Sequence, residues 1–95
     1  MNSITVSELL LLFNPDIIDI RDNNLYREGH IPGANNIPID LLLQDPSRYI
    51  KSAGTYYLYC DFGLTSSRIC QVLSQLGYNV INIADGYYGY EILKK

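Results

Sequence analysis

The sequence predicts an α/β fold, in which helices cover the faces of a sheet, formed by one domain spanning residues 1–95. A chain of 95 residues suits a single domain. Its 47% hydrophobic and 18% charged residues are typical of a folded chain and argue against disorder. Short apolar runs with alternating strand and helix character are separated by turn signals at Asn14-Pro15, Pro32-Gly33, Asp45-Pro46, Gly77 and Asp85-Gly86.

The first predicted helix begins after Thr5. Thr5 and Glu8 have the spacing of a capping box, and Ile4 and Leu9 occupy the positions of a hydrophobic staple. Pro15 disfavours the helical conformation in the residue before it, so we expect the element to end there.

The middle of the chain predicts a buried strand followed by short elements. Residues 17–20 are mostly apolar, as in a strand that is buried on both faces. We expect a short helix over 23–28 that stops at Gly29, and then a turn-rich loop over 30–34. A brief strand around Ile37 and a helical turn over 39–43 follow.

The second half predicts strand, helix, strand and helix. Residues 55–59 are rich in strand formers and end at Cys60. A loop over 61–65 leads to a helix over 66–76, which has apolar residues at helical spacing, Ser66 as its N-cap and Gly77 as its stop. Residues 80–83 form the last predicted strand and residues 87–94 a closing helix.

Charge and cysteine content exclude several classes of protein. A net charge of −3 and a pI near 4.8 argue against the basic surface of a nucleic-acid binder, so any anion site must be local. Two cysteines cannot form a secreted disulfide scaffold. The apolar run over 9–13 is too short for a signal peptide or a membrane span. We therefore expect a cytoplasmic protein with reduced thiols and no membrane partner.

Cys60 lies between a predicted strand and a predicted loop and helix, and this segment indicates a reactive thiolate. Ligands of open α/β sheets bind beyond the carboxyl ends of the strands, where Cys60 is placed. The first N–H groups of the following helix lack partners and carry partial positive charge, which stabilises a thiolate. Gly63 lets the loop fold tightly, so that successive N–H groups form an anion nest. The alternative is a buried structural cysteine beside a helix cap.

Several ordered motifs make the chain resemble the single-domain rhodaneses, which are sulfurtransferases. The matching stretches are IIDIR at 17–21, Tyr26, GHIPGA at 29–34, Ile37-Pro38, YCDFGLTSSR at 59–68 and LGYNV at 76–80. The resemblance covers nearly the whole chain and places Cys60 in the position of the family's nucleophile.

This resemblance implies a small parallel five-stranded sheet with helices on both faces, and persulfide chemistry. Cys60 would attack the outer sulfur of thiosulfate, a thiol persulfide or a protein persulfide, and would pass that sulfur to a thiol, cyanide or a protein acceptor. Loop N–H groups would hold the persulfide charge, without any metal or organic cofactor. The expected substrate-binding residues are Asp61, Phe62, Gly63, Leu64, Thr65, Ser66 and Arg68.

The loop departs from the family pattern in its charge. Many members that use thiosulfate carry arginine five residues after the cysteine, where this chain has Thr65. Asp61 is a like charge beside both a thiolate and an anionic donor. We therefore expect weak activity with thiosulfate and favour a thiol or protein persulfide as donor. Arg68, expected in the first turn of the helix, is either the nearby positive side chain or a surface or ion-paired arginine.

Other matching residues are interpreted as parts of the fold. Asp19 and Arg21 are expected to make polar contacts, and His30 to hydrogen-bond within its loop. Near the end of the chain, Gly86 allows a turn and Tyr90 takes the place of a packed aromatic residue.

The sequence allows two interpretations of Cys70 and of the C-terminal tyrosines. Cys70 lies on the apolar face of its helix, where packing is the favoured reading over a redox partnership with Cys60. The tyrosines at 56, 57 and 59 are expected to pack on the sheet. Those at 87, 88 and 90 either pack or form an acceptor-docking surface.

Two alternative functions remain open from the sequence. Phosphatases and arsenate reductases of the same fold need arginine six residues after the cysteine, where this chain has Ser66, so the spacing argues against them. A non-catalytic binding module is the other alternative, favoured by Asp61 and by the missing loop arginine. Inactive members of the family commonly lack the cysteine that this chain keeps.

Overall fold

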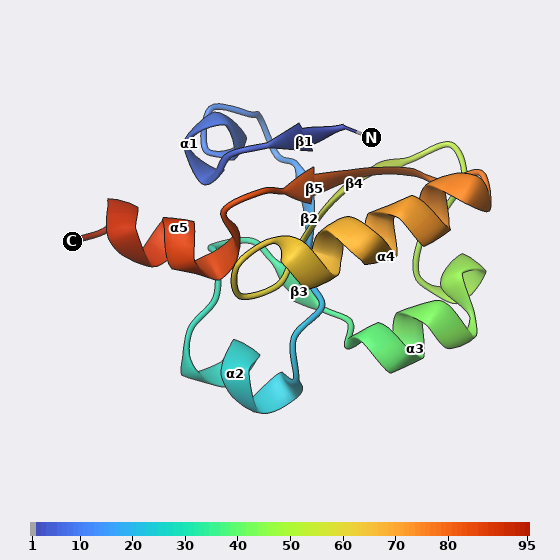
Figure 1. The fold of residues 1–95 in the computed structure, drawn as a ribbon, viewed down its shortest axis with the longest axis horizontal. Helices are drawn as coiled ribbons and strands as arrows, with labels where there is room; N and C mark the ends of the chain where they lie inside the picture. The colour runs from blue at the N-terminus through green and yellow to red at the C-terminus, as the bar shows by residue number, and fades with distance from the viewer. Residues whose placement is uncertain (1) are drawn as a thin grey trace.

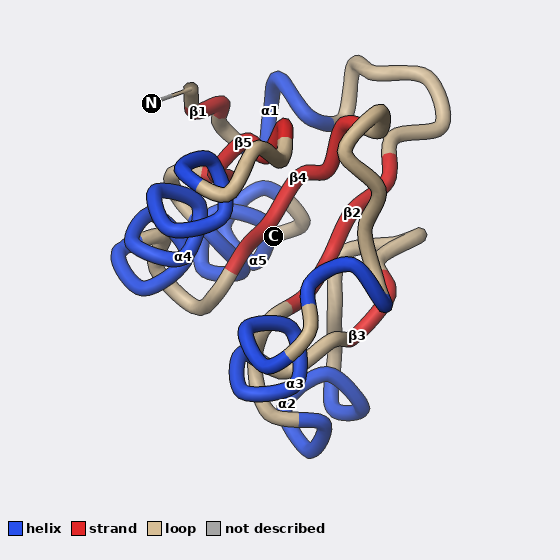
Figure 2. Tube along the Cα trace, turned by 90° about the vertical axis from the view of Figure 1, so that its right-hand side faces the viewer, coloured by secondary structure: helices blue, strands red, loops and turns tan. Residues whose placement is uncertain are grey.

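A five-stranded, all-parallel sheet forms the centre of the computed structural model, which describes residues 2–95. The strands run in the order β1-β5-β4-β2-β3, with β4 in the middle (Figure 2). Their bounds are Ser3–Ile4 (β1), Asp16–Asp19 (β2), Asn35–Asn36 (β3), Thr55–Tyr59 (β4) and Asn79–Ile83 (β5). The helices are Val6–Leu9 (α1), Asn23–Glu28 (α2), Ile39–Gln44 (α3), Leu64–Gln75 (α4) and Gly86–Leu93 (α5), with a 3₁₀ turn at Pro46–Arg48.

Helices cover both faces of the sheet because successive strand residues point to opposite sides (Figure 1). On one side, Ile18 and Leu58 pack with Leu42 of α3 and Leu73 of α4. On the other, Ile17, Tyr59 and Ile83 pack with α1, α2 and α5 through Val6, Leu9, Tyr26, Tyr87 and Tyr90. This confirms the predicted architecture of a parallel sheet between two helical layers.

The N-terminal helix is shorter than predicted. Its capping box is formed, since Glu8 N–H donates to Thr5 Oγ1 at 3.2 Å and Thr5 N–H donates to Glu8 Oε1 at 2.9 Å. The helix ends at Leu9, well before Pro15, and continues as turns with exposed side chains. The leucines after Leu9 are exposed, so extending the helix over them would bury little apolar surface. The helix therefore ends with its C-cap at Leu10, five residues before Pro15.

Two short edge strands complete the sheet. Ser3–Ile4 pairs with β5, an element that sequence reasoning missed because two residues carry no periodic signal. β3 lies at Asn35–Asn36, just before the expected position at Ile37, whose N–H donates to Asp19 O at 3.0 Å. Strand β4 and helix α2 have the predicted bounds.

The start of α4 corrects the prediction for Ser66. The N-cap is Gly63, with a left-handed φ of 90°, and the helix begins at Leu64. Ser66 is fully buried in the first turn, and its hydroxyl is directed to Asn82 rather than to a helix N–H. The loop after Cys60 is therefore two residues shorter than expected, because Leu64 and Thr65 already belong to the helix.

The interpretation of Asp19, Arg21 and His30 as fold contacts agrees with the structure. The Arg21 guanidinium donates to Asp19 Oδ2 and to Gly29 O, both at 2.7 Å. His30 Nδ1 lies 2.8 Å from Tyr26 O, and the two rings stack. These contacts tie the turn-rich loop to the end of β2.

Candidate active site

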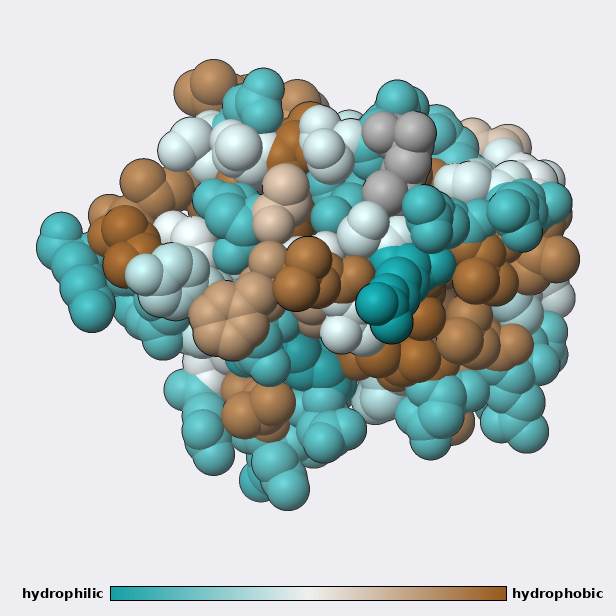
Figure 3. Space-filling model, viewed as in Figure 1, coloured by the Kyte–Doolittle hydropathy of each residue, from teal (hydrophilic) through white to brown (hydrophobic). Residues whose placement is uncertain are grey.

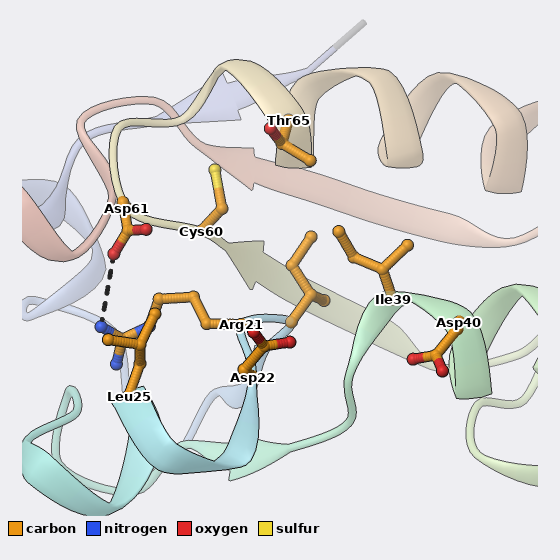
Figure 4. Close-up of a pocket in the computed structure, with 9 residues that line it drawn as sticks. Arg21, Asp22, Leu25, Ile39, Asp40, Cys60, Asp61 and Thr65 are labelled. Atoms are coloured by element: carbon orange, nitrogen blue, oxygen red, sulfur yellow. Dashed lines mark hydrogen bonds and ion pairs between the residues drawn. The ribbon is translucent and has the colours of Figure 1, made fainter.

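Cys60 follows the central strand β4 at the carboxyl edge of the sheet, where α/β folds bind ligands. It is 8% exposed, and its sulfur points toward the N-terminal turn of α4 (Figure 4). The buried strand therefore fixes the backbone of the residue while the sulfur stays within reach of solvent.

Two backbone N–H groups point at this sulfur. Those of Gly63 and Ser66 donate to Cys60 Sγ at 3.2 and 3.3 Å. The thiol is also 3.3 Å from Ser66 Oγ. Such donors, at the positive end of a 12-residue helix, stabilise negative charge on sulfur.

Further N–H groups surround the space outside the sulfur. Among residues 2–95, the N–H groups of Phe62, Leu64 and Thr65 have no hydrogen-bond acceptor. Together with Cys60 and Asp61, these residues line a cavity of about 200 Å³. An anion bound there would meet donors that the fold leaves free.

Close contacts with β5 and α5 hold the loop. A Cβ added at Gly63 would collide with Ala84 O. One added at Gly86, where φ is 60°, would lie 2.7 Å from Cys60 O. The N–H groups of Tyr87 and Tyr88 donate to Cys60 O and Asp61 O, both at 2.9 Å. The geometry at the sulfur therefore depends on glycine at both positions, and the turn predicted at Gly86 is confirmed.

A buried polar network lies beneath the loop. Ser66 Oγ donates to Asn82 Oδ1 at 2.5 Å, and Asn82 Nδ2 donates to Gly63 O at 3.1 Å. Ser66 is fully buried and Asn82 nearly so. Asn82, on β5, thus links the two residues whose N–H groups contact the sulfur.

A larger cavity of about 380 Å³ opens on the other side of Cys60 (Figure 4). Asp61 of the loop and Thr65 of α4 line one wall, while residues following β2 and at the start of α3 line the opposite wall. Its full lining is Ile20, Arg21, Asp22, Leu25, Ile39, Asp40, Cys60, Asp61 and Thr65.

The positive side chain at this cavity is Arg21, which corrects the expectation for Arg68. Arg68 is the fifth residue of α4, beyond the first turn. Its side chain is exposed and lines neither cavity at Cys60. Arg21 is buried and lies 3.5 Å from Asp61 Oδ1. Burial opposes its charge, but the hydrogen bond and charge of Asp19 dominate and raise the pKa of Arg21 above its usual range. Its charge is thus largely compensated within the fold.

Cys70 is enclosed in the core, as the packing interpretation expects. Both cysteines are free thiols, and Cys70 is fully buried. Burial, together with the charge of Cys60, raises the pKa of Cys70 to about 12. The buried thiol is therefore protonated at neutral pH.

The C-terminal tyrosines divide between packing and exposure. Tyr87 and Tyr90 are half-buried and pack against the core, as predicted for Tyr90. Burial raises the pKa of Tyr87, whose ring centroid lies 4.3 Å from the Arg21 guanidinium carbon. Tyr88 is exposed, with its ring centroid 5.5 Å from that of Phe62.

Four polar residues of the site were not assigned to it from the sequence, although Arg21 was named as a fold contact. Asp22 and Arg21 follow the end of β2, at the same sheet edge as Cys60, so the strand-end rule could have pointed to them. Asn82 interrupts an apolar strand, which is a signal for a buried polar contact. Asp40 reaches the cavity through the packing of α3, for which the sequence carries no local signal. Among residues 2–95, no three His, Cys, Asp or Glu side chains gather as a metal site, and no helix is long and apolar enough to span a membrane.

Comparisons with known proteins agree with this geometry. The family model for the rhodanese-like domain matches residues 5–92. The uncharacterized protein YqhL of Bacillus subtilis is 38% identical over 72 residues, and the thiosulfate sulfurtransferase PspE of Escherichia coli is 30% identical over 70. The crystal structure of a rhodanese-like domain protein from Staphylococcus aureus superposes with a TM-score of 0.82 at 28% identity, covering 95% of this chain and 91% of that one.

The curated relatives are longer than the matched region. It covers 75% of this chain and 56% of YqhL, and 73% of this chain and 67% of PspE. The chain thus spans little more than half the length of YqhL and about two thirds of PspE.

Proposed function

The chain belongs to the rhodanese-like domain family, and we propose that it is a sulfurtransferase that carries sulfane sulfur as a persulfide on Cys60. The observation that carries the proposal is the pair of N–H groups, from Gly63 and Ser66, that point at Cys60 Sγ. A merely structural cysteine does not require a glycine loop that directs donors at its sulfur.

In the first step, the Cys60 thiolate attacks the outer sulfur of the donor. The new Sγ–S bond forms as the donor's own bond to that sulfur breaks, and the donor leaves as sulfite or as a thiolate. Negative charge moves to the outer sulfur of the persulfide. The N–H groups of Phe62, Leu64 and Thr65, which line the adjoining cavity, would receive it.

In the second step, an acceptor thiolate or cyanide attacks the outer sulfur. The Sγ–S bond breaks, the acceptor gains one sulfur atom and Cys60 returns as a thiolate. No electrons are gained or lost overall, so the cycle requires no redox cofactor. The exposed rings and methyl groups of Phe62 and Leu64 would contact the acceptor.

Charge at the site favours donors other than thiosulfate. Asp61 stands beside Cys60, and the Arg21 charge is shared with Asp19. Thr65 offers a hydroxyl but no positive charge. A dianion therefore gains little attraction on approach, so we propose a persulfide of a thiol or a protein as the donor.

A sulfur-transfer assay tests the proposal. Purified protein is given thiosulfate or glutathione persulfide with cyanide as acceptor, and thiocyanate is measured. Wild type and Cys70→Ser should turn over, while Cys60→Ser should lose turnover with either donor. If Cys60→Ser matched wild type, or if no donor supported turnover in folded protein, a non-catalytic binding module would account better for the chain.

A further inference from the structure

We propose that the Cys60 site takes its sulfur from, or gives it to, a protein whose reacting cysteine is flanked by lysine or arginine side chains. This partner class deepens the proposed function and rests on it for the sulfur step. The selection of a cationic partner rests on the charges and apolar groups that surround Cys60.

Carboxylates dominate the walls around the sulfur. Asp22, Asp40 and Asp61 line the larger cavity with Cys60. An adjoining cavity, which shares Arg21, Leu25 and Asp61 with it, adds Glu28 and Glu91. Asp22, Glu28, Asp40 and Asp61 are exposed, so their charges act on anything that approaches the cysteine.

The nearby cations do not balance these carboxylates. Arg21 is buried in its pair with Asp19, at 2.7 Å, and with Gly29 O, and so offers little free charge. Lys94 pairs with Glu91 at 3.1 Å. Arg21 also lies 3.5 Å from Asp61 Oδ1, so three carboxylates, of Asp22, Glu28 and Asp40, stand without an ion pair among residues 2–95. They leave a negative approach to Cys60, although the whole chain carries a net charge of only −3.

The opposite rim of the site is apolar. Phe62, Leu64 and Tyr88 are 64%, 78% and 55% exposed, and the Phe62 and Tyr88 rings pack against each other. Apolar side chains lie over the start of α4 on the face drawn in Figure 3. Aromatic and leucine side chains around a reactive centre suit a polypeptide surface better than a small polar metabolite.

Together these two rims specify the partner. Negative charge repels the thiosulfate dianion and the phosphates of nucleic acids, whereas it attracts a basic protein surface. A lysine or arginine two residues from the reacting cysteine could face Asp22 or Asp40 while apolar neighbours contact Phe62 and Leu64. A free small cation would satisfy only the first of these contacts.

Disulfide probes measure this selectivity without requiring persulfide chemistry. The Cys60 thiolate attacks one sulfur of a symmetrical disulfide, forming a mixed disulfide and releasing one thiolate. We would use disulfides of the acetylated, amidated pentapeptides Lys-Ala-Cys-Ala-Lys and Glu-Ala-Cys-Ala-Glu, together with cystamine as a small cationic disulfide. Rates are divided by those of N-acetylcysteine amide with the same probe, and peptide mapping assigns the modified cysteine.

The expected magnitudes follow from Coulomb's law. Unit charges about 10 Å apart in water change a rate by about twofold per pair. With several pairs, the lysine peptide should react roughly tenfold faster than the glutamate peptide at about 10 mM salt. At about 0.5 M salt the ratio should fall toward one, because screening is then effective within a few ångströms.

Charge variants locate the source of the preference. Asp22→Asn with Asp40→Asn should lower the ratio at least threefold. Asp16→Asn is the matched control, since this exposed aspartate lies at the start of β2, the opposite edge of the sheet, and it should leave the ratio unchanged. Phe62→Ala should slow both peptides relative to cystamine, because only a peptide reaches the apolar rim.

Each outcome supports or overturns the inference. Equal normalised rates for the two peptides, or a ratio that Asp22→Asn with Asp40→Asn leaves intact, would overturn charge selection. Unchanged peptide rates in Phe62→Ala would overturn a polypeptide partner in favour of small cations. Because these reactions need only the Cys60 thiolate, their failure leaves the persulfide proposal standing. Conversely, a protein that shows the selectivity but never accepts sulfur would contradict the proposed function alone.

Discussion

Replacing Gly63 with alanine separates two physical effects on the loop that holds Cys60. Gly63, Gly33 and Gly77 have similar left-handed φ values of 90°, 87° and 97°. Around a Cβ at Gly33 or Gly77 there is open space within 4 Å, whereas a Cβ at Gly63 would collide with Ala84 O. The three substitutions therefore share backbone strain, and only Gly63→Ala adds a collision.

The expected free energies follow from this comparison. Placing alanine in the left-handed region costs about 1–2 kcal/mol, which Gly33→Ala and Gly77→Ala should show. Overpacking against a fixed carbonyl adds about 1–3 kcal/mol, so Gly63→Ala should lose about 2–5 kcal/mol. Because the displaced loop also carries the Gly63 N–H away from Cys60 Sγ, sulfur transfer should fall at least tenfold in this variant alone.

Urea denaturation followed by circular dichroism gives the three unfolding free energies, and the thiocyanate assay gives turnover. A Gly63→Ala variant that is no less stable than Gly77→Ala would refute the collision with Ala84 O. A Gly63→Ala variant that is destabilised yet transfers sulfur at the rate of Gly33→Ala would refute the link between this loop and the sulfur of Cys60.

Four further changes test other parts of the account. Asn82→Leu removes two buried hydrogen bonds, the one it donates to Gly63 O and the one it accepts from Ser66 Oγ, and should lower the unfolding free energy by about 1–3 kcal/mol in urea. Asn79→Leu, at an exposed asparagine of the same strand, should change it by about 0.5 kcal/mol or less. Arg21→Met leaves the buried Asp19 carboxylate without its ion pair and should lower the unfolding free energy by about 3–5 kcal/mol. Arg68→Met, at an exposed arginine, should change it by about 0.5 kcal/mol or less, and equal losses in the two variants would contradict the structure. Thr65→Arg adds positive charge to the lining of both cavities and should raise kcat/KM for thiosulfate about four- to tenfold, with no gain expected in the size-matched Thr65→Gln. Burial raises the pKa of Cys70 from 9.0 to about 12, so the unfolded chain loses this proton at a lower pH than the folded protein does. Ionisation of Cys70 should therefore lower the unfolding free energy by at most about 1.4 kcal/mol per pH unit between pH 9 and 12. Urea denaturation at several pH values measures this slope, which Cys70→Ser should reduce.

Much of the fold was predictable because local signals and the global fold agree. The capping box at Thr5 and Glu8 forms as expected, and the strand formers at 55–59 become the central strand. Element ends were less predictable where burial decides them. The exposed leucines after Leu9 leave α1 short. At position 63, glycine has no Cβ that would collide with Ala84 O, and it adopts the left-handed conformation from which α4 starts at Leu64.

The residues of the candidate site that belong to the motif around Cys60 were predictable, whereas those from distant segments were not. The motif around Cys60 indicates the loop, and the structure brings Asp61, Phe62, Leu64 and Thr65 to the same cavity. Arg68 belongs to the same motif in the sequence, but it is exposed on α4 and lines neither cavity.

Residues from other elements complete the site through tertiary packing. Asp40 and Asn82 reach it from α3 and β5, whose placement depends on contacts between distant segments. A single sequence specifies those contacts only through the complete fold.

Intact-protein mass after incubation with glutathione persulfide tests the central claim most directly. A persulfide carried on Cys60 predicts a gain of one sulfur atom that cyanide removes, that Cys60→Ser abolishes and that Cys70→Ser retains. The same gain in Cys60→Ser, or no gain in folded wild type with either glutathione persulfide or thiosulfate, would contradict a persulfide carried on Cys60.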